Sequence, residues 1–112
     1  MNLPEITVTE LAEMRNSQAE HVLLDVREMG EFSHCRIEGA IAAPLSHIAQ
    51  KGLAALPKGV THDQRIVVQC HHGSRSAQIT AWLMQEGYEQ VSNLAGGIDA
   101  WSREIDPDVA RY

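Results

Sequence analysis

Residues 65–76 read RIVVQCHHGSRS, and this stretch decides the fold of the 112-residue chain. Its first part, Arg65 to Gln69, is a short apolar run typical of a strand that is buried on both faces. Cys70 follows directly, and Gly73 marks a tight loop. Beyond the loop, apolar residues recur at spacings of three and four until Gly87, which is the pattern of a helix and its stop signal. The stretch therefore predicts a buried strand, a loop and a helix in succession.

The same alternation of short strands and helices runs along the rest of the chain. A second continuous apolar run, HVLLDV at 21–26, has the length of a buried parallel strand. Strands this apolar need cover on both faces, so we expect an α/β fold of three layers, a parallel sheet with helices on both sides. The other expected strands lie at 6–8, within 39–44 and at 91–94, and the expected helices include 11–14, 31–33, 45–56, 77–84 and 98–103.

Two spacings of three residues predict where helices begin. Thr7-x-x-Glu10 matches a capping box, with Thr9 as an alternative cap, ahead of the first helix. Asp25-x-x-Glu28 offers a second box for the short helix that follows the 21–26 strand. Both boxes place a helix directly after a strand, as an α/β fold requires.

Composition excludes several classes of function. Fifteen acidic residues against nine Lys and Arg give a net charge of −6, which repels nucleic acids and anionic membranes, so neither is an expected partner. Two cysteines are too few for a secreted disulfide scaffold, and the sequence shows neither a signal peptide nor a membrane span. The expected location is the cytoplasm. The length suits one domain, residues 1–112, with no second domain for a cofactor.

Cys70 is the strongest candidate for chemistry. Ligands of open parallel sheets bind beyond the carboxyl ends of the strands. A cysteine at that edge, before a tight loop and a helix, lies over backbone N–H groups at the positive end of the helix. Arg75 adds a fixed positive charge, and all these effects favour a thiolate. We therefore expect Cys70 to be a nucleophile, supported by Arg75.

Two other interpretations of this loop remain. Free cysteines are often buried structural residues, and Cys70 could be one of them. His71 and His72 could serve as a base or as metal ligands, but neighbouring residues in a tight loop rarely point at one centre, and further ligands with suitable spacing are missing. We expect no metal; the two histidines instead shape the mouth of the pocket and its charge near neutral pH.

Five motifs in this order give the sequence a family resemblance. They are LLDVRE at 23–28, EF at 31–32, RIEGAI at 36–41, VVQCHHGSRS at 67–76 and LAGGIDAW at 94–101. The set resembles the rhodanese-like domain family, specifically its single-domain members, and it spans nearly the whole chain. The resemblance implies a parallel sheet of about five strands with helices on both faces.

The resemblance also implies sulfurtransfer. The Cys70 thiolate would take a sulfane sulfur from a small-molecule donor such as thiosulfate and form a persulfide. It would then pass the sulfur to an acceptor such as cyanide or a thiol, without a cofactor. We expect a monomeric enzyme of this thiosulfate:cyanide type. The alternative is a persulfide carrier or interaction module that turns over poorly alone and works with a partner protein in a sulfur relay.

Loop length distinguishes this function from a third one. Related phosphatases and arsenate reductases have five residues between the Cys and the Arg, whereas this chain has four: His71, His72, Gly73 and Ser74. The smaller ring should hold one sulfur atom, with the N–H groups of 71–75 directed at it. These four residues are therefore expected to bind the substrate sulfur. We expect a strained backbone conformation at Gly73.

Other residues match the family pattern near the same edge of the sheet. Asp25 and Arg27 are expected in the binding site, where they would help to order the loop, although Asp25 could equally cap the next helix. Ser74 and Ser76 could bond the persulfide, but at least one of them is expected to cap the helix that follows. Gly96 and Gly97, considered as a pair, should allow the last turn.

Two features depart from the family pattern. The stretch Cys35-Arg36-Ile37-Glu38 lies where relatives commonly show Gly-His-Ile-Pro. Cys35 either fills a small apolar gap or acts as a resolving thiol that attacks an oxidised or persulfidated Cys70. The loop also lacks the basic pair found after the cysteine in two-domain thiosulfate enzymes, so the physiological donor stays open. Trp101, in the last motif, is expected to pack in the core.

Overall fold

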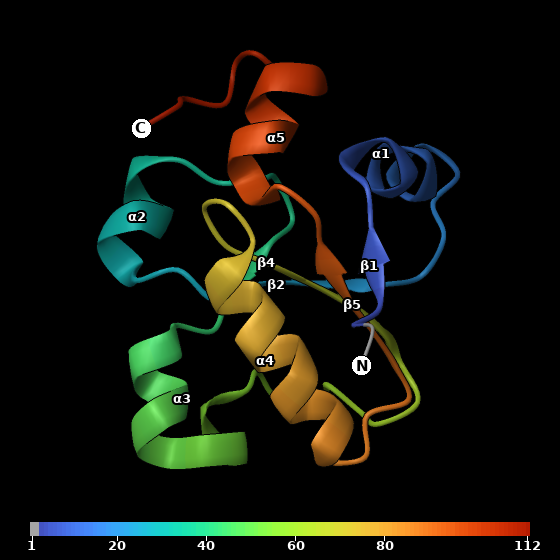
Figure 1. Ribbon diagram of the computed structural model, residues 1–112, viewed down its shortest axis with the longest axis vertical. Helices are drawn as coiled ribbons and strands as arrows, with labels where there is room; N and C mark the ends of the chain where they lie inside the picture. Colours follow the sequence, from blue (N-terminus) through green and yellow to red (C-terminus); the bar gives the residue numbers. More distant parts are fainter. Residues whose placement is uncertain (1–2) are drawn as a thin grey trace.

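The computed structural model describes residues 3–112 and contains one five-stranded parallel sheet (Figure 1). Strand β4 lies at its centre, between β5 and β2, so the Cys70 loop leaves the sheet from the middle. β1 pairs with β5, although these strands come from opposite ends of the chain. The order is β1-β5-β4-β2-β3, with bounds Glu5–Ile6 (β1), Val22–Asp25 (β2), Ile41–Ala42 (β3), Arg65–Gln69 (β4) and Gln90–Leu94 (β5).

Helices cover both faces of this sheet, and the predicted three-layer α/β fold is confirmed. Helices α1 and α5 pack on one face, and α3 and α4 pack on the other (Figure 1). Helix α2 lies at the edge of the sheet where the strands end. The bounds are Val8–Asn16 (α1), Met29–His34 (α2), Leu45–Lys51 (α3), Ser74–Gln85 (α4) and Gly97–Glu104 (α5), with a 3-10 turn, Gly52–Ala55, after α3.

Strand β4 shows why its sequence is apolar without interruption. Ile66 and Val68 pack in the core under α3 and α4, whereas Val67 packs in the core under α1 and α5, and all three are fully buried. Successive side chains point to opposite faces, and here both faces are covered. Trp101 of α5 is buried in the second core, as predicted.

The helix starts confirm one predicted cap and correct the other. Thr7 caps α1 in a complete capping box with Glu10. Asp25 does not cap α2: the N-cap is Glu28, in a capping box with Glu31. The sequence contains two overlapping pairs with the same spacing, and the helix uses the later one because the Asp25 carboxylate binds Arg27 instead.

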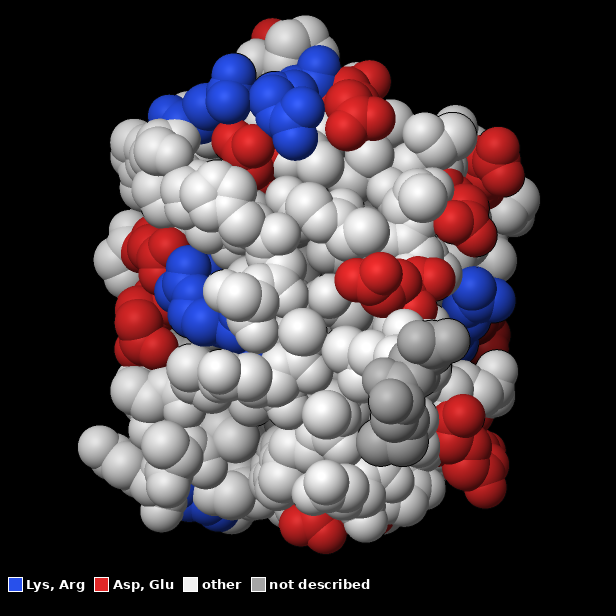
Figure 2. Space-filling model, in the orientation of Figure 1, with Lys and Arg blue, Asp and Glu red and all other residues white. Residues whose placement is uncertain are grey.

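Within residues 3–112, no helix is long and apolar enough to cross a membrane. Charged groups are spread unevenly on the face shown in Figure 2. Lys and Arg gather at the end that carries α5 and the C-terminal segment, where acidic side chains accompany them (Figure 2).

Candidate active site

The sulfur of Cys70 lies at the carboxyl end of β4, in front of the first turn of α4. It accepts hydrogen bonds from the backbone N–H of Gly73 (3.1 Å) and of Ser76 (3.4 Å). The Ser76 hydroxyl is 3.3 Å from the same sulfur. These donors, together with the positive end of a 12-residue helix, favour negative charge on Sγ. The residue is 1% exposed and borders the core under α3 and α4.

The loop takes its shape from Gly73. Its φ of 115° lies in the left-handed region, as predicted for this position. Gly73 is also the N-cap of α4, without a side-chain cap, so the prediction that Ser74 or Ser76 caps this helix is wrong. Ser74 is the exposed first residue of α4. Ser76 is buried, and its hydroxyl lies within hydrogen-bond distance of Asn93 as well as of Cys70.

Helix α5 holds the loop from behind. The N–H of Ile98 donates to the carbonyl of Cys70 (2.9 Å), and the N–H of Asp99 donates to the carbonyl of His71 (3.0 Å). Gly97 makes this close approach possible, because a Cβ there would lie 2.4 Å from the Cys70 carbonyl oxygen and 2.5 Å from that of His71. Gly97 thus lets α5 support the Cys70 loop, in addition to the part that it and Gly96 have in the turn.

Arg75 points to an acidic partner that the sequence analysis did not assign to the site. Its guanidinium binds the Glu31 carboxylate at 2.6 and 3.0 Å. This hydrogen bonding lowers the pKa of Glu31 to about 2, against the opposing effect of burial. It also raises the pKa of Arg75, and the negative charges of Glu31 and Cys70 add to that shift. Arg75 therefore contributes a positive charge that is partly balanced by Glu31.

Asp25 and Arg27 form a buried ion pair. The Arg27 Nη2 atom is 2.6 Å from Asp25 Oδ2, and both side chains are 0% exposed. Burial alone would lower the pKa of Arg27, but its hydrogen bonds to Asp25 and Tyr112 outweigh burial and raise it. Arg27 also donates to the carbonyl of Cys35. A substrate cannot reach either side chain in this structure, which favours the ordering role over the expected contact with substrate.

His71 and His72 lie at the mouth of the loop. Their ring centroids lie 3.9 Å apart with the planes tilted by 31°, and burial, followed by the charge of His72, lowers the pKa of His71. The structure brings Asp99 to them, and ligand atoms of the three residues lie within 4.8 Å of one another. Asp99 therefore supplies the additional candidate metal ligand that sequence spacing did not reveal. However, the Asp99 carboxylate already binds Arg103 (3.0 Å) and Arg111 (3.2 Å).

Cys35 and Cys70 pack in different parts of the core. Cys35 packs against the core under α1 and α5, whereas Cys70 belongs to the core under α3 and α4. Both thiols are free in the described structure. This packing fits the interpretation in which Cys35 fills a small gap beside Arg27, whose Nη1 is 3.8 Å from its sulfur, while the resolving-thiol hypothesis stays a prediction.

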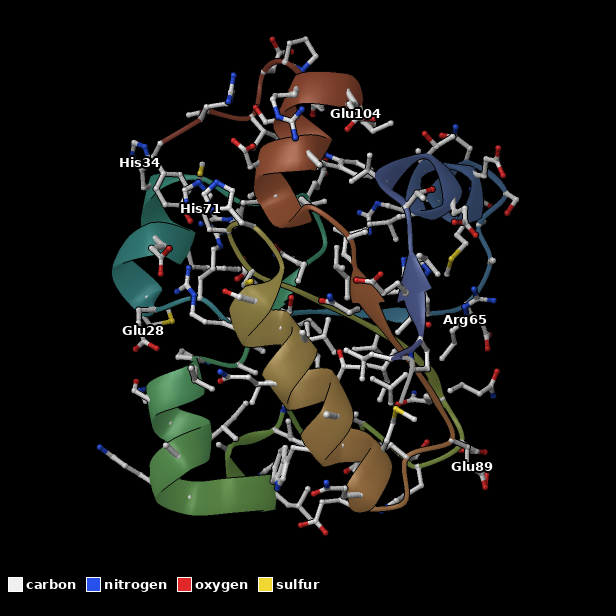
Figure 3. The ribbon with its side chains drawn as sticks, viewed as in Figure 1. Glu28, His34, Arg65, His71, Glu89 and Glu104 are labelled. Atoms are coloured by element: carbon white, nitrogen blue, oxygen red, sulfur yellow. The ribbon has the colours of Figure 1, made fainter. Side chains whose placement is uncertain are left out.

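Two residues of the site were missed by sequence reasoning. Glu31 had a signal, since it belongs to the EF motif at 31–32. Tyr112 had none, yet its ring stacks on that of His71 with centroids 3.9 Å apart and planes 7° apart. Figure 3 shows His71 and His34 at the end of the molecule where the C-terminal segment passes.

Comparisons with known proteins agree with this geometry. The family model described as "Rhodanese-like domain" matches residues 7–104. A sulfurtransferase of Allochromatium vinosum is 39% identical over 103 residues, covering 91% of this chain and 92% of the relative. The thiosulfate sulfurtransferase GlpE of Glaesserella parasuis is 31% identical, with 96% and 94% covered. The probable adenylyltransferase/sulfurtransferase MoeZ of Mycobacterium tuberculosis is 36% identical, but this chain covers only 26% of its length.

A solved structure shares the fold. The crystal structure of a rhodanese-related protein from Thermoplasma volcanium superimposes with a TM-score of 0.77 at 30% identity, covering 97% of this chain and 99% of the other. An α/β sheet with a cysteine loop at the end of its central strand defines the class. The chain belongs to the rhodanese-like domain family, and its sulfurtransferase relatives support sulfurtransferase activity.

Proposed function

We propose that Cys70 is the nucleophile and sulfur carrier of a thiosulfate:cyanide type sulfurtransferase. The observation that carries the proposal is the set of donors on its sulfur: the N–H groups of Gly73 and Ser76 and the Ser76 hydroxyl. These groups are oriented before any substrate arrives, so they stabilise negative charge on sulfur without reorganisation. Arg75 adds a positive charge; its guanidinium lies beside α2, where it binds Glu31.

The cycle has two displacements at sulfur. The Cys70 thiolate attacks the outer sulfur of thiosulfate; the S–S bond breaks, and sulfite leaves with the electron pair. Cyanide then attacks the outer sulfur of the Cys70 persulfide, thiocyanate is released, and the thiolate returns. No net oxidation occurs over the cycle, so the proposed reaction needs no cofactor. The loop residues His71, His72, Gly73 and Ser74 surround the transferred sulfur.

The test is thiocyanate production from thiosulfate and cyanide. Cys70→Ser should reduce it to the uncatalysed background, because a hydroxyl cannot carry the sulfane sulfur. Cys35→Ser is the matched control: it removes the other thiol, which packs against the core under α1 and α5, and should retain the parent's rate. A Cys70→Ser protein as active as the parent would sink the proposal.

The persulfide carrier remains the second candidate, because one relative, MoeZ, contains the matched region as about a quarter of a longer protein. A carrier would gain the mass of one sulfur atom on Cys70 after incubation with a donor, yet release little thiocyanate. A transfer enzyme gives both results. Mass spectrometry of the protein before and after cyanide therefore separates the two candidates.

A further inference from the structure

The segment that follows α5 is fixed in place across the mouth of the active-site loop. It runs from the end of α5 toward α2 (Figure 1). The Ser102 hydroxyl donates to the carbonyl of Val109, and the Val109 N–H donates to the carbonyl of Asp106. Arg111 binds Asp99 on α5 at 3.2 Å. These bonds bring Tyr112 over the loop.

The Tyr112 hydroxyl joins two ion pairs. It accepts a hydrogen bond from Arg27 Nη1 (2.9 Å) and donates one to Glu31 Oε2 (2.7 Å). Arg27 is held by Asp25, and Glu31 holds Arg75. The hydroxyl is thus the link between the buried pair after β2 and the pair beside Cys70.

Tyr112 is chemically suited to this link. Burial raises its pKa to about 12, with a smaller contribution from Glu31, so the phenol keeps its proton and can donate and accept at once. Its ring is stacked on His71 and meets His34 edge-on, with centroids 5.8 Å apart. Hydroxyl and ring therefore fix different parts of the site: Glu31 in one case, His71 in the other.

We propose that Tyr112 is a positioning residue for Cys70 chemistry: its hydroxyl holds Glu31 and thereby orients Arg75, while its ring holds His71 at the mouth of the loop. The proposal rests on the proposed function for its effect on transfer. Its effect on the reactivity of the Cys70 sulfur does not depend on which reaction the protein performs.

The hydroxyl is tested by Tyr112→Phe, which keeps the ring. In a Cys35→Ser background, so that Cys70 is the remaining thiol, we expect alkylation by iodoacetamide at neutral pH to slow about two- to tenfold, the size of one lost hydrogen bond. Thiocyanate production should fall by a similar factor. Tyr112→Leu, which also loses the stack on His71, should lower both rates further.

The link through Glu31 is tested by a double-mutant cycle. Glu31→Gln should slow alkylation at least as much as Tyr112→Phe, and the double variant should be no slower than Glu31→Gln alone, because both changes act on one connection. Tyr88→Phe is the matched control; Tyr88 follows α4, near the opposite end of the sheet, and losing its hydroxyl should change neither rate.

Two results would overturn the inference: an alkylation rate of folded Tyr112→Phe equal to that of the parent, or additive effects of Tyr112→Phe and Glu31→Gln. Circular dichroism confirms that each variant is folded. Failure of the proposed function is a separate result, because it appears as thiocyanate production that does not depend on Cys70, whatever the alkylation rates are.

Discussion

β2 and β4 are neighbours in the sheet, and each ends in a polar sequence, but the two ends differ in how their polar groups are satisfied. After β2, Asp25 and Arg27 bind each other and are closed to solvent. After β4, the Cys70 sulfur receives several donors and has no opposing charge bound to it directly. A fully paired strand end serves the structure, whereas donors that converge on one sulfur atom are what the proposed chemistry at the neighbouring strand end requires.

The largest effect is expected from breaking the pair after β2. Asp25→Asn leaves Arg27 as an uncompensated buried cation and should lower the free energy of unfolding by about 3–5 kcal/mol. Urea denaturation measures it. Glu89→Gln is the control; Glu89 is exposed at the far end of the molecule (Figure 3), and the change should stay within about 0.5 kcal/mol. If both variants lose the same free energy of unfolding, the ion pair after β2 has no special structural role.

A smaller loss of stability, accompanied by a loss of activity, is expected from a substitution at Gly97, which supports the loop after β4. Gly97→Ala places a methyl group 2.4 Å from the Cys70 carbonyl oxygen at a φ of 59°. The loop must shift, so stability should fall by about 1–3 kcal/mol, and thiocyanate production should fall with it.

Gly30 in α2 provides the matched control for this substitution, because a Cβ there meets nothing within 4 Å. Gly30→Ala should leave stability unchanged or raise it by up to about 1 kcal/mol. If Gly97→Ala is as active and as stable as Gly30→Ala, the α5 support is not needed by the loop.

The smallest effect concerns the partly exposed pair beside Cys70. The pKa of Glu31 is lowered from 4.5 to about 2, so its charge stabilises the fold above pH 4.5, and this contribution is lost as the pH falls toward 2. Glu31→Gln should therefore melt at a lower temperature than the parent above pH 4.5, by the equivalent of at most about 1 kcal/mol, because the pair is part-exposed. The difference should shrink toward pH 2. A difference that does not depend on pH would contradict the ion pair.

Local sequence rules predicted the elements but not the pairs between them. The apolar runs at 21–26 and 65–69 identified both central strands, because strands buried on two faces leave an uninterrupted apolar sequence. The Asp25 cap failed where a local rule competed with a tertiary contact. Asp25 and Glu28 have the same spacing as Glu28 and Glu31, which form the observed capping box. The ion pair between Asp25 and Arg27 decides between the two, because it engages the Asp25 carboxylate.

The candidate site was predictable where it is contiguous. Cys70, Gly73 and Arg75 lie in one stretch, and their chemistry follows from a strand end, a loop and a helix N-terminus. Glu31 lies 44 residues from its contact Arg75, and Tyr112 lies 41 residues from its contact His71. Such separations carry no periodic signal, so only the folded chain reveals these contacts.

β5 must pair with β1, from the opposite end of the chain, before this side of the sheet is complete. The loop around Cys70 leans on α5, and β5 leads into α5, so the segments that support it arrive late in synthesis. A growing chain that ends before β5 contains Cys70 and the donors of its sulfur in the first turn of α4, but it lacks the N–H groups of α5 that hold the carbonyls of Cys70 and His71. The loop therefore gains its full support only when this long-range pairing has formed, and such pairing is slow in protein folding.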